Sequence, residues 1–367
     1  MNILYVSAKK GWGGVITWMH RTAVGLEARG HKAWILSHPA SPFTQLAPTD
    51  VTIIPRRLGM DYNPAAILFL ATFIKRHHVD VVVTNIQKEV IAGGLAARLC
   101  GVPNVRMLGN ELDVNDRVKR RQEALVDHTI VPSDSTLMLA KKQAPWLQLA
   151  RCSTIYAGRD PVAFSEEEIT GLRRTWGIPD GALVFGTTAR LTRIKGIDQL
   201  IEAFGVVARE HPSTYLVVTG EGPERAGLEA LASGLGVREH VIFAGFSTEP
   251  MKTAAAYDVA VLNSSVEGFP YVIVEYMAAG RPVVATDVGG VREIVRDKEN
   301  GLLLSAGDRA ALIHALVALR TDAAARARLG ANALATIRTG FSEAIMCERT
   351  ERVFEQVVAR KAKARGA

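Results

Sequence analysis

The sequence predicts an α/β protein made of two doubly wound parallel sheets, one after the other along the chain. Short runs rich in Val and Ile alternate with amphipathic stretches, as in a parallel sheet covered by helices on both faces. The short runs are apolar at nearly every position, which indicates strands buried on both sides. A chain of 367 residues has room for two domains of roughly 150 residues each.

In the first half, strands and helices alternate until about residue 152. The expected strands cover 3–7, 33–37, 51–54, 79–84, 105–108 and 128–131. The expected helices cover 15–29, 64–77, 90–99 and 133–143. Residues 155–161 then read as a strand followed by a turn, and we place the interdomain linker at about 158–164.

The alternation restarts after the linker. The expected strands cover 183–188, 214–219, 241–243, 259–262, 283–286 and 302–304. The expected helices cover 197–210, 223–235, 272–279 and 309–319. The predicted domains are 1–160, joined by a long charged C-terminal helix at 342–363, and 161–341. Two such domains in series leave a cleft that faces the carboxyl ends of both sheets, where ligands bind in these folds.

Composition excludes several classes of protein. With 48% hydrophobic and 22% charged residues, the chain is not intrinsically disordered. Cys100, Cys152 and Cys347 are odd in number and widely spaced, so we expect reduced thiols in a cytoplasmic protein and no metal site. The longest charge-free apolar stretch, 64–74, is too short to span a membrane. The first residues carry no basic segment typical of a signal peptide.

Positive charge is concentrated in the first half of the chain. Residues 1–162 carry 20 Lys and Arg against 12 Asp and Glu, whereas residues 163–367 carry 24 against 25. This asymmetry indicates either an anionic partner, such as a membrane surface, an acidic acceptor or nucleic acid, or a charge that serves solubility alone. The run 117–121, which contains Lys119, Arg120 and Arg121, is expected on a helix that contacts a membrane or phosphate, or that is merely solvated.

Residues 263–290 carry the densest chemical signal. A polar loop follows the strand at 259–262 and leads through Glu267 into a helix. The first N–H groups of a helix form an anion site, and the helix dipole adds to it. We expect the N–H groups of Tyr271, Val272 and Ile273 to point at a phosphate, with Gly268 allowing close approach of a ligand.

Two glutamates flank the start of this helix. Glu267 and Glu275 would lie about 12 Å apart if the rise of an α-helix applied throughout. That separation is too wide for the paired carboxylates of a glycoside hydrolase, at about 5–9.5 Å, and suits an elongated ligand gripped at both ends. Glu267 would accept hydrogen bonds from sugar hydroxyls and Glu275 from a ribose diol. The alternative is that they are ordinary capping or surface carboxylates.

Two cations and two glycines complete the set of candidates. Arg190 and Lys195 follow a strand and precede a helix, where they can neutralise the charge that develops on a leaving diphosphate. If no anion is bound, a cation at a helix start is mildly unfavourable. Gly13 and Gly14 form a strand-to-helix turn that suits phosphate or acceptor contact, although such turns are common in these folds.

These motifs resemble the retaining glycosyltransferases of family 4, which have the GT-B fold. The resemblance is specific from about 183 to 304 and looser over the first half. It rests on these pieces: Glu267-x7-Glu275 with Gly268-Phe269-Pro270, Gly280-Arg281-Pro282-Val283-Val284, Arg190…Lys195-Gly196, Gly220-Glu221-Gly222-Pro223, Phe243-Ala244-Gly245-Phe246 and Gly11-Trp12-Gly13-Gly14. The first half departs from the family because a histidine is missing after Pro103, where Gly109 or Asn110 stands.

The resemblance implies roles for individual residues. The implied catalytic residues are Glu267, Arg190, Lys195, Asn110 and Glu111, with Asp113 as a further candidate for the contact that the missing histidine would make. The implied nucleotide-sugar-binding residues are Gly13, Gly14, Gly220, Phe246, Gly268, Phe269, Pro270, Tyr271, Val272, Ile273 and Glu275. Phe246 belongs to the segment that packs on the nucleotide base.

The activity that this resemblance implies is a metal-independent, retaining hexosyltransferase without a cofactor. It would move a sugar from a nucleotide-diphosphate sugar, such as a UDP-sugar, to a saccharide or lipid-linked saccharide in polysaccharide or lipopolysaccharide synthesis. We expect a cytoplasmic protein that is peripheral to the inner face of the membrane and binds no nucleic acid. The alternatives are an epimerase on the same fold and an inactive nucleotide-sugar binder. A nicotinamide-dependent dehydrogenase is disfavoured because the Gly11–Gly14 loop lacks the last glycine of Gly-x-Gly-x-x-Gly.

Overall fold

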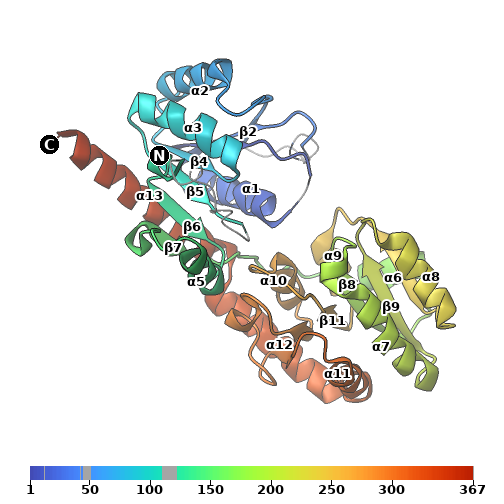
Figure 1. The fold of residues 1–367 in the computed structure, drawn as a ribbon. Helices are drawn as coiled ribbons and strands as arrows, with labels where there is room; N and C mark the ends of the chain where they lie inside the picture. The colour runs from blue at the N-terminus through green and yellow to red at the C-terminus, as the bar shows by residue number, and fades with distance from the viewer. Residues whose placement is uncertain (12, 42, 44–50, 110–121, 367) are drawn as a thin grey trace. The chain divides into compact units, whose positions relative to one another are not determined.

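The computed structural model describes the whole chain except residues 12, 42, 44–50, 110–121 and 367. The chain divides into two compact units. Unit 1 contains Met1–Ala157 and Glu343–Ala367, and unit 2 contains Gly158–Ser342. Each unit is described by itself below, and Figure 1 shows the elements of both. No helix among the described residues has the length and apolar character needed to cross a membrane.

Unit 1 is built on a parallel sheet with the strand order β3-β2-β1-β4-β5-β6-β7. Its strands are β1 (Asn2–Ser7), β2 (Lys32–Ser37), β3 (Thr52–Pro55), β4 (Val81–Thr84), β5 (Asn104–Met107), β6 (His128–Val131) and β7 (Cys152–Thr154). Its helices are α1 (Gly14–Glu27), α2 (Pro64–Arg76), α3 (Gln87–Cys100), α5 (Asp134–Gln143) and α13 (Glu343–Gly366). Short 3-10 turns are η2 (Glu123–Leu125) and η3 (Leu149–Arg151).

Unit 2 repeats this plan with the strand order β10-β9-β8-β11-β12-β13. Its strands are β8 (Leu183–Thr188), β9 (Thr214–Thr219), β10 (Val241–Gly245), β11 (Val259–Leu262), β12 (Val283–Thr286) and β13 (Gly301–Leu304). Its helices are α6 (Glu166–Thr175), α7 (Ile197–Glu210), α8 (Arg225–Gly234), α9 (Pro250–Ala255), α10 (Tyr271–Ala278), α11 (Arg309–Thr321) and α12 (Ala323–Gly340). Its 3-10 turns are η4 (Arg193–Lys195) and η5 (Val291–Glu293).

The two doubly wound sheets expected from the sequence are therefore confirmed. All strand pairs are parallel, so the loops that follow the strands of one sheet lie along one edge, which we call its carboxyl rim. The core strands are buried on both faces, as in β4 and β11. Two expectations are corrected: β7 (Cys152–Thr154) ends before residues 155–161, which were expected to begin with a strand, and α6 and α9 were not expected. The basic run at 117–121 lies outside the described residues.

The C-terminal helix α13 packs on α1 within unit 1. Its inner face buries Met346, Cys347 and Phe354. Ion pairs hold both ends, because Glu343 bonds Arg21 at 2.9 Å and Lys361 bonds Asp127 at 2.6 Å. The last segment of the chain is thus an integral part of the first compact unit.

Candidate active site

Two loops on the carboxyl rim of unit 2 are locked together. The first follows β8 and includes η4, and the second follows β11 and leads to α10. The buried amide of Asn263 donates to the Gly196 carbonyl at 2.9 Å, and the Ser265 N–H donates to the Ile194 carbonyl at 2.8 Å. Gly196 has a φ of 56°, and a Cβ there would lie 2.3 Å from the Asn263 carbonyl oxygen, so only glycine allows this approach.

These loops bring the predicted catalytic residues Lys195 and Glu267 into contact. Lys195 Nζ lies 2.6 Å from Glu267 Oε1, and their side chains are 20% and 9% exposed. A carboxylate this deeply buried needs a charged or hydrogen-bonding partner. The sequence predicted both residues as site residues, and the structure makes them an ion pair across 72 positions of the chain.

A third loop, which follows β12, packs against the backbone of Glu267 and Gly268. The Gly290 N–H donates to the Gly268 carbonyl at 2.8 Å. Gly289 has a φ of 53°, and a Cβ on it would lie 1.7 Å from the carbonyl oxygen of Glu267. Sequence reasoning assigned Gly289 no role. The pair Gly289-Gly290, separated by two residues from the end of β12, was the available signal, but the residue that it supports lies 22 positions earlier in the sequence.

Helix α10 begins at Tyr271, one residue before the expected helix at 272–279, with Pro270 at its N-cap and no side-chain cap. Val272 is the second helical residue, and N–H groups in this first turn lack an intrahelical acceptor. The Ile273 N–H, which we expected to face a phosphate, instead donates to the Pro270 carbonyl at 3.1 Å. The anion site at this helix start therefore rests on fewer amides than the sequence suggested.

Glu275 lies on α10, whereas Glu267 precedes the helix. The separation of about 12 Å estimated from helical rise therefore does not apply to this pair. Glu275 is half-buried near two buried tyrosines. Burial raises the pKa of Tyr257 to about 12, and the charge of Glu275 contributes in the same direction. The hydroxyl oxygen of Tyr276 accepts from the Thr188 N–H at 2.6 Å, which ties α10 to the end of β8.

The other predicted residues of unit 2 also lie on its carboxyl rim. Arg190 is exposed in the loop after β8, and no described carboxylate forms a salt bridge with it. Gly220 has a backbone role, since a Cβ there would lie 1.9 Å from the Ala189 carbonyl oxygen. Phe246, just after β10, is 63% exposed and offers an open ring face.

In unit 1 the glycine loop leads into α1. Gly13 is its N-cap and Gly14 its first residue. A Cβ on either glycine would meet no atom within 4 Å, so the space beside both is open. Asn110, Glu111 and Asp113 lie outside the described residues. Within the described part of the chain, no group of three or more His, Cys, Asp or Glu side chains could hold a metal ion.

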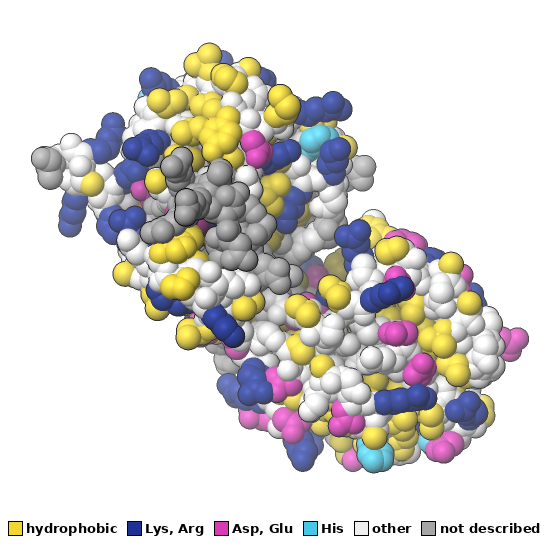
Figure 2. Space-filling view, viewed as in Figure 1, with side chains coloured by type: hydrophobic (Ala, Val, Ile, Leu, Met, Phe, Trp, Pro, Cys, Tyr) yellow, Lys and Arg dark blue, Asp and Glu magenta, His cyan; other side chains and the backbone are white. Residues whose placement is uncertain are grey.

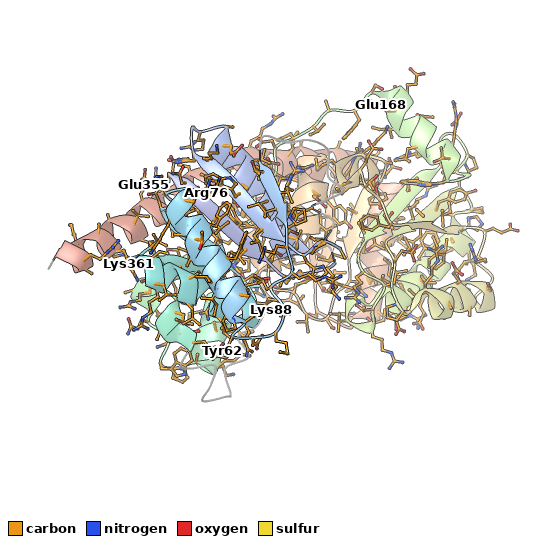
Figure 3. The ribbon with its side chains drawn as sticks, turned by 90° about the horizontal axis from the view of Figure 1, so that it is seen from above. Tyr62, Arg76, Lys88, Glu168, Glu355 and Lys361 are labelled. Atoms are coloured by element: carbon orange, nitrogen blue, oxygen red, sulfur yellow. The ribbon has the colours of Figure 1, made fainter. Side chains whose placement is uncertain are left out.

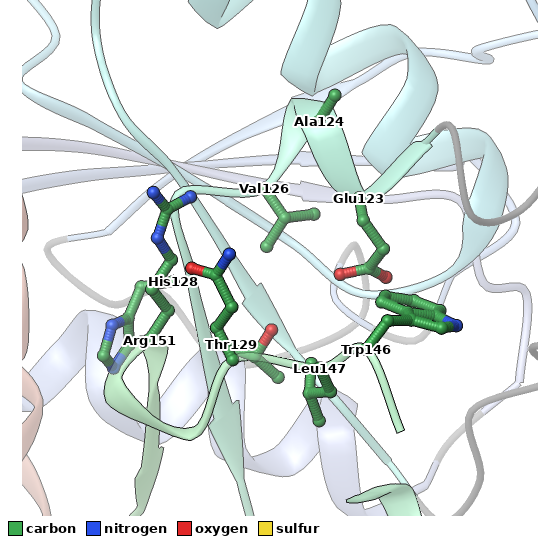
Figure 4. Close-up of a pocket in the computed structure, with 9 residues that line it drawn as sticks. Glu123, Ala124, Val126, His128, Thr129, Trp146, Leu147 and Arg151 are labelled. Carbon is green, nitrogen blue, oxygen red and sulfur yellow. The ribbon is translucent and has the colours of Figure 1, made fainter. Parts of the chain in front are cut away.

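A cavity of about 240 Å³ lies elsewhere in unit 1 (Figure 4). Its lining residues come from 123–129 and 146–151 and include Glu123, His128 and Trp146. These segments precede or begin β6 and β7, so the cavity lies toward the rim opposite the glycine loop. None of the predicted site residues lines it.

Comparison with known proteins assigns the chain to a family. The model of glycosyl transferases group 1 matches residues 168–336, and the model of glycosyltransferase family 4 matches residues 12–162. D-inositol 3-phosphate glycosyltransferase from Xylanimonas cellulosilytica is 31% identical over 338 residues, which cover 84% of this chain and 79% of that protein. The lipopolysaccharide core biosynthesis glycosyltransferase LpsD from Rhizobium meliloti is 35% identical over 183 residues, 50% of this chain and 52% of LpsD.

Solved structures share the fold over nearly the whole chain. A glycosyltransferase from Rickettsia africae superimposes with a TM-score of 0.87 and 18% identity over 97% of this chain and 98% of that one. HepE from Anabaena, solved with UDP and glucose, superimposes with a TM-score of 0.84 and 23% identity over 97% of this chain and 100% of HepE. By contrast, the matches to the first three curated relatives span only 37–52% of the lengths of those proteins. The matches along both halves show that the chain belongs to the family 4, or group 1, glycosyltransferases and has their GT-B fold.

Proposed function

We propose that this glycosyltransferase moves a hexose from a nucleotide-diphosphate sugar to a saccharide or lipid-linked saccharide, with retention of the anomeric configuration. Unit 2 would hold the donor and unit 1 the acceptor. The observation that carries the proposal is the Lys195–Glu267 pair on a rim where Arg190 and the start of α10 also lie. This arrangement combines a buried carboxylate with groups that stabilise negative charge.

The charges on this rim suit the departure of a nucleoside diphosphate. As the bond between the sugar C1 and the diphosphate oxygen breaks, negative charge grows on the phosphate. Arg190, Lys195 and the first N–H groups of α10 can stabilise that charge. Lys195 would then share its ammonium between the phosphate and Glu267, and the released Glu267 oxygen would accept from a sugar hydroxyl.

In a reaction without a covalent glycosyl-enzyme intermediate, which we propose here, retention requires that the acceptor attack from the side that the diphosphate leaves. The acceptor oxygen bonds to C1 on that face, and its proton passes to an oxygen of the departing diphosphate. Phe246 would stack on the nucleotide base and Glu275 would accept from the ribose hydroxyls. Because two side-chain cations and a helix start supply positive charge, we propose that the reaction needs no divalent metal and no cofactor.

Named relatives support the choice of donor and product. HepE structures contain UDP or UDP-glucose, which supports a UDP-sugar as donor. LpsD and LpsE of Rhizobium meliloti are named for lipopolysaccharide core biosynthesis, which supports a cell-surface glycan as product. We further propose that the protein works in the cytoplasm, peripherally at the inner face of the membrane, and that Asn110 or Glu111 replaces the missing histidine of the family.

The test is the release of UDP from a panel of UDP-hexoses, with and without saccharide acceptors and with EDTA. We expect turnover that depends on an acceptor, survives EDTA and vanishes in Lys195→Ala, while Arg309→Ala, an exposed cation on α11, stays active. An isomerised sugar in the absence of acceptor would instead indicate an epimerase. Binding of UDP without turnover on any acceptor would indicate an inactive binder.

A further inference from the structure

Three cations and a histidine, on four neighbouring loops, lie along the carboxyl rim of unit 1. Lys10 follows β1, His38 follows β2, Arg57 follows β3, and Lys88 follows β4 in the first turn of α3. The strand order β3-β2-β1-β4 sets these four loops side by side. We call these four side chains the cationic rim. In Figure 2, the part that Figure 1 colours blue to cyan shows many Lys and Arg side chains and few acidic ones.

The backbone of this rim is tied together. The His38 N–H donates to the Ser7 carbonyl at 3.2 Å, which joins the loop after β2 to the end of β1. The Arg56 N–H donates to the Ser37 carbonyl at 2.7 Å, which joins the loop after β3 to the end of β2. Arg56 Cζ lies 3.7 Å from the centroid of the Phe69 ring, so Arg56 packs on that ring, whereas Arg57 is exposed.

Glu89 ties the remaining two loops. This fully buried carboxylate accepts from the Ala8 N–H at 2.6 Å, after β1, and from the Asn85 and Ile86 N–H groups at 2.8 and 3.0 Å, after β4. The Glu89 carboxylate therefore accepts its hydrogen bonds from three backbone N–H groups and, as far as the structure describes the chain, forms no salt bridge with the cations of the rim. Hydrogen bonds between neighbouring loops thus hold the backbone that carries these side chains in place.

Positive charges gather on this rim. Burial lowers the pKa of His38, and Lys10, Arg57 and Lys88 lower it further, so all three lie close enough to repel an imidazolium. Among the described residues, none of these three cations forms a salt bridge with a carboxylate. Asp61, which accepts from Gln87 at 3.4 Å, is an acid on the same rim.

Gathering like charges on a pinned framework is unfavourable unless an anion binds there. Lys88 adds to this cost because a cation in the first turn of a helix opposes the helix dipole. Three cations and an imidazole from four neighbouring loops match a phosphate, which has several acceptor oxygens and can bond more than one donor at once.

We infer that the cationic rim binds a phosphate group of the acceptor, so that the acceptor is a phosphorylated saccharide or a lipid-linked saccharide phosphate. The inference rests on the proposed function and narrows its acceptor class. The donor diphosphate has its own cations in unit 2, Arg190 and Lys195. The two sites can therefore be separated by mutation.

The probe is a soluble hexose 6-phosphate, compared with the unphosphorylated hexose, titrated into the full chain in low salt. Vesicles that contain phosphatidate, compared with neutral vesicles, distinguish a lipid-borne phosphate from a soluble one. The variant is Arg57→Ala with Lys88→Ala, and the control is Arg76→Ala. Arg76 is an exposed cation in the last turn of α2, and Figure 3 shows it at the end of that helix away from Lys88 and Tyr62.

We expect the phosphorylated probe, on hexose or vesicle, to bind at least tenfold more tightly than its neutral counterpart. The double variant should lose about tenfold in affinity, since each charged contact with phosphate contributes a few-fold, and Arg76→Ala should lose little. Equal binding of charged and neutral probes, or full affinity in the double variant, overturns the inference. UDP binding is measured on the same samples. If the double variant still binds UDP, only the rim has been affected. If the unmodified chain does not bind UDP, that result contradicts the proposed function and not this inference.

Discussion

Replacement of Gly289 by Ala should disable the site without touching a residue that contacts substrate. The added Cβ would lie 1.7 Å from the Glu267 carbonyl oxygen, whereas ordinary contact begins at 3.4 Å. The Glu267 loop must therefore shift by about 1.7 Å. Misplacement by about 1 Å can lower a rate by about 100-fold, so we expect a loss of at least that size in UDP release.

A matched control separates this displacement from backbone strain. Gly289 has a φ of 53°, and Gly181 has a φ of 80° with no atom within 4 Å of its added Cβ. Gly181→Ala should destabilise the protein by about 1–2 kcal/mol, because a residue with a Cβ resists positive φ. Gly289→Ala should cost more, because its Cβ also clashes with the Glu267 carbonyl oxygen. Only Gly289→Ala should lose turnover at a temperature where both variants are folded. Equal turnover in the two variants would refute the claim that Gly289 sets the position of Glu267.

Three further predictions concern an ion pair, an aromatic ring and a histidine. Lys195→Met should lower stability by about 2 kcal/mol in urea unfolding, since it leaves the Glu267 carboxylate unpaired, and adding Glu267→Gln should restore stability but not turnover. Unchanged stability in the single variant would contradict the pairing. Phe246→Ala should leave the melting temperature unchanged and weaken UDP binding by about tenfold in calorimetry, as expected for lost base stacking; unaltered affinity would exclude Phe246 from the base site. The pKa of His128 is lowered to about 4, first by burial and then by the charge of Arg360. The contribution of neutral His128 to the free energy of unfolding is therefore present above pH 6.5 and is lost as the pH falls toward 4. The full loss is about 3 kcal/mol. His128→Gln should flatten the decline in urea-unfolding free energy between pH 7 and 4.5, and an unchanged slope would count against this histidine.

The sequence predicted best those elements whose local pattern also describes their final surroundings. β8, β9 and β11 match the predicted bounds because continuous apolar runs ended by polar loops correspond directly to strands buried on both faces. Helix α6 was not predicted because it buries no residue and its ten residues include only Ile169 and Leu172 as large apolar side chains. Its capping box, Ser165 with Glu168, was the signal that could have found it.

The site was predictable as a set of residues but not as a geometry. Lys195 and Glu267 were both chosen from local motifs, yet their contact depends on the pairing of β8 with β11, which neither motif encodes. The support that Gly289 gives to Glu267 arises in the same way, from the adjacency of β11 and β12. The estimated separation of the two glutamates assumed one continuous helix, but the helix begins after Glu267, at Tyr271.

The most direct test is a crystal structure of the chain with UDP-glucose or another UDP-hexose. We predict that the diphosphate lies beside Arg190, Lys195 and the start of α10, with the sugar within hydrogen-bonding distance of Glu267. A donor bound away from these residues, with the Lys195–Glu267 pair untouched, would contradict the account.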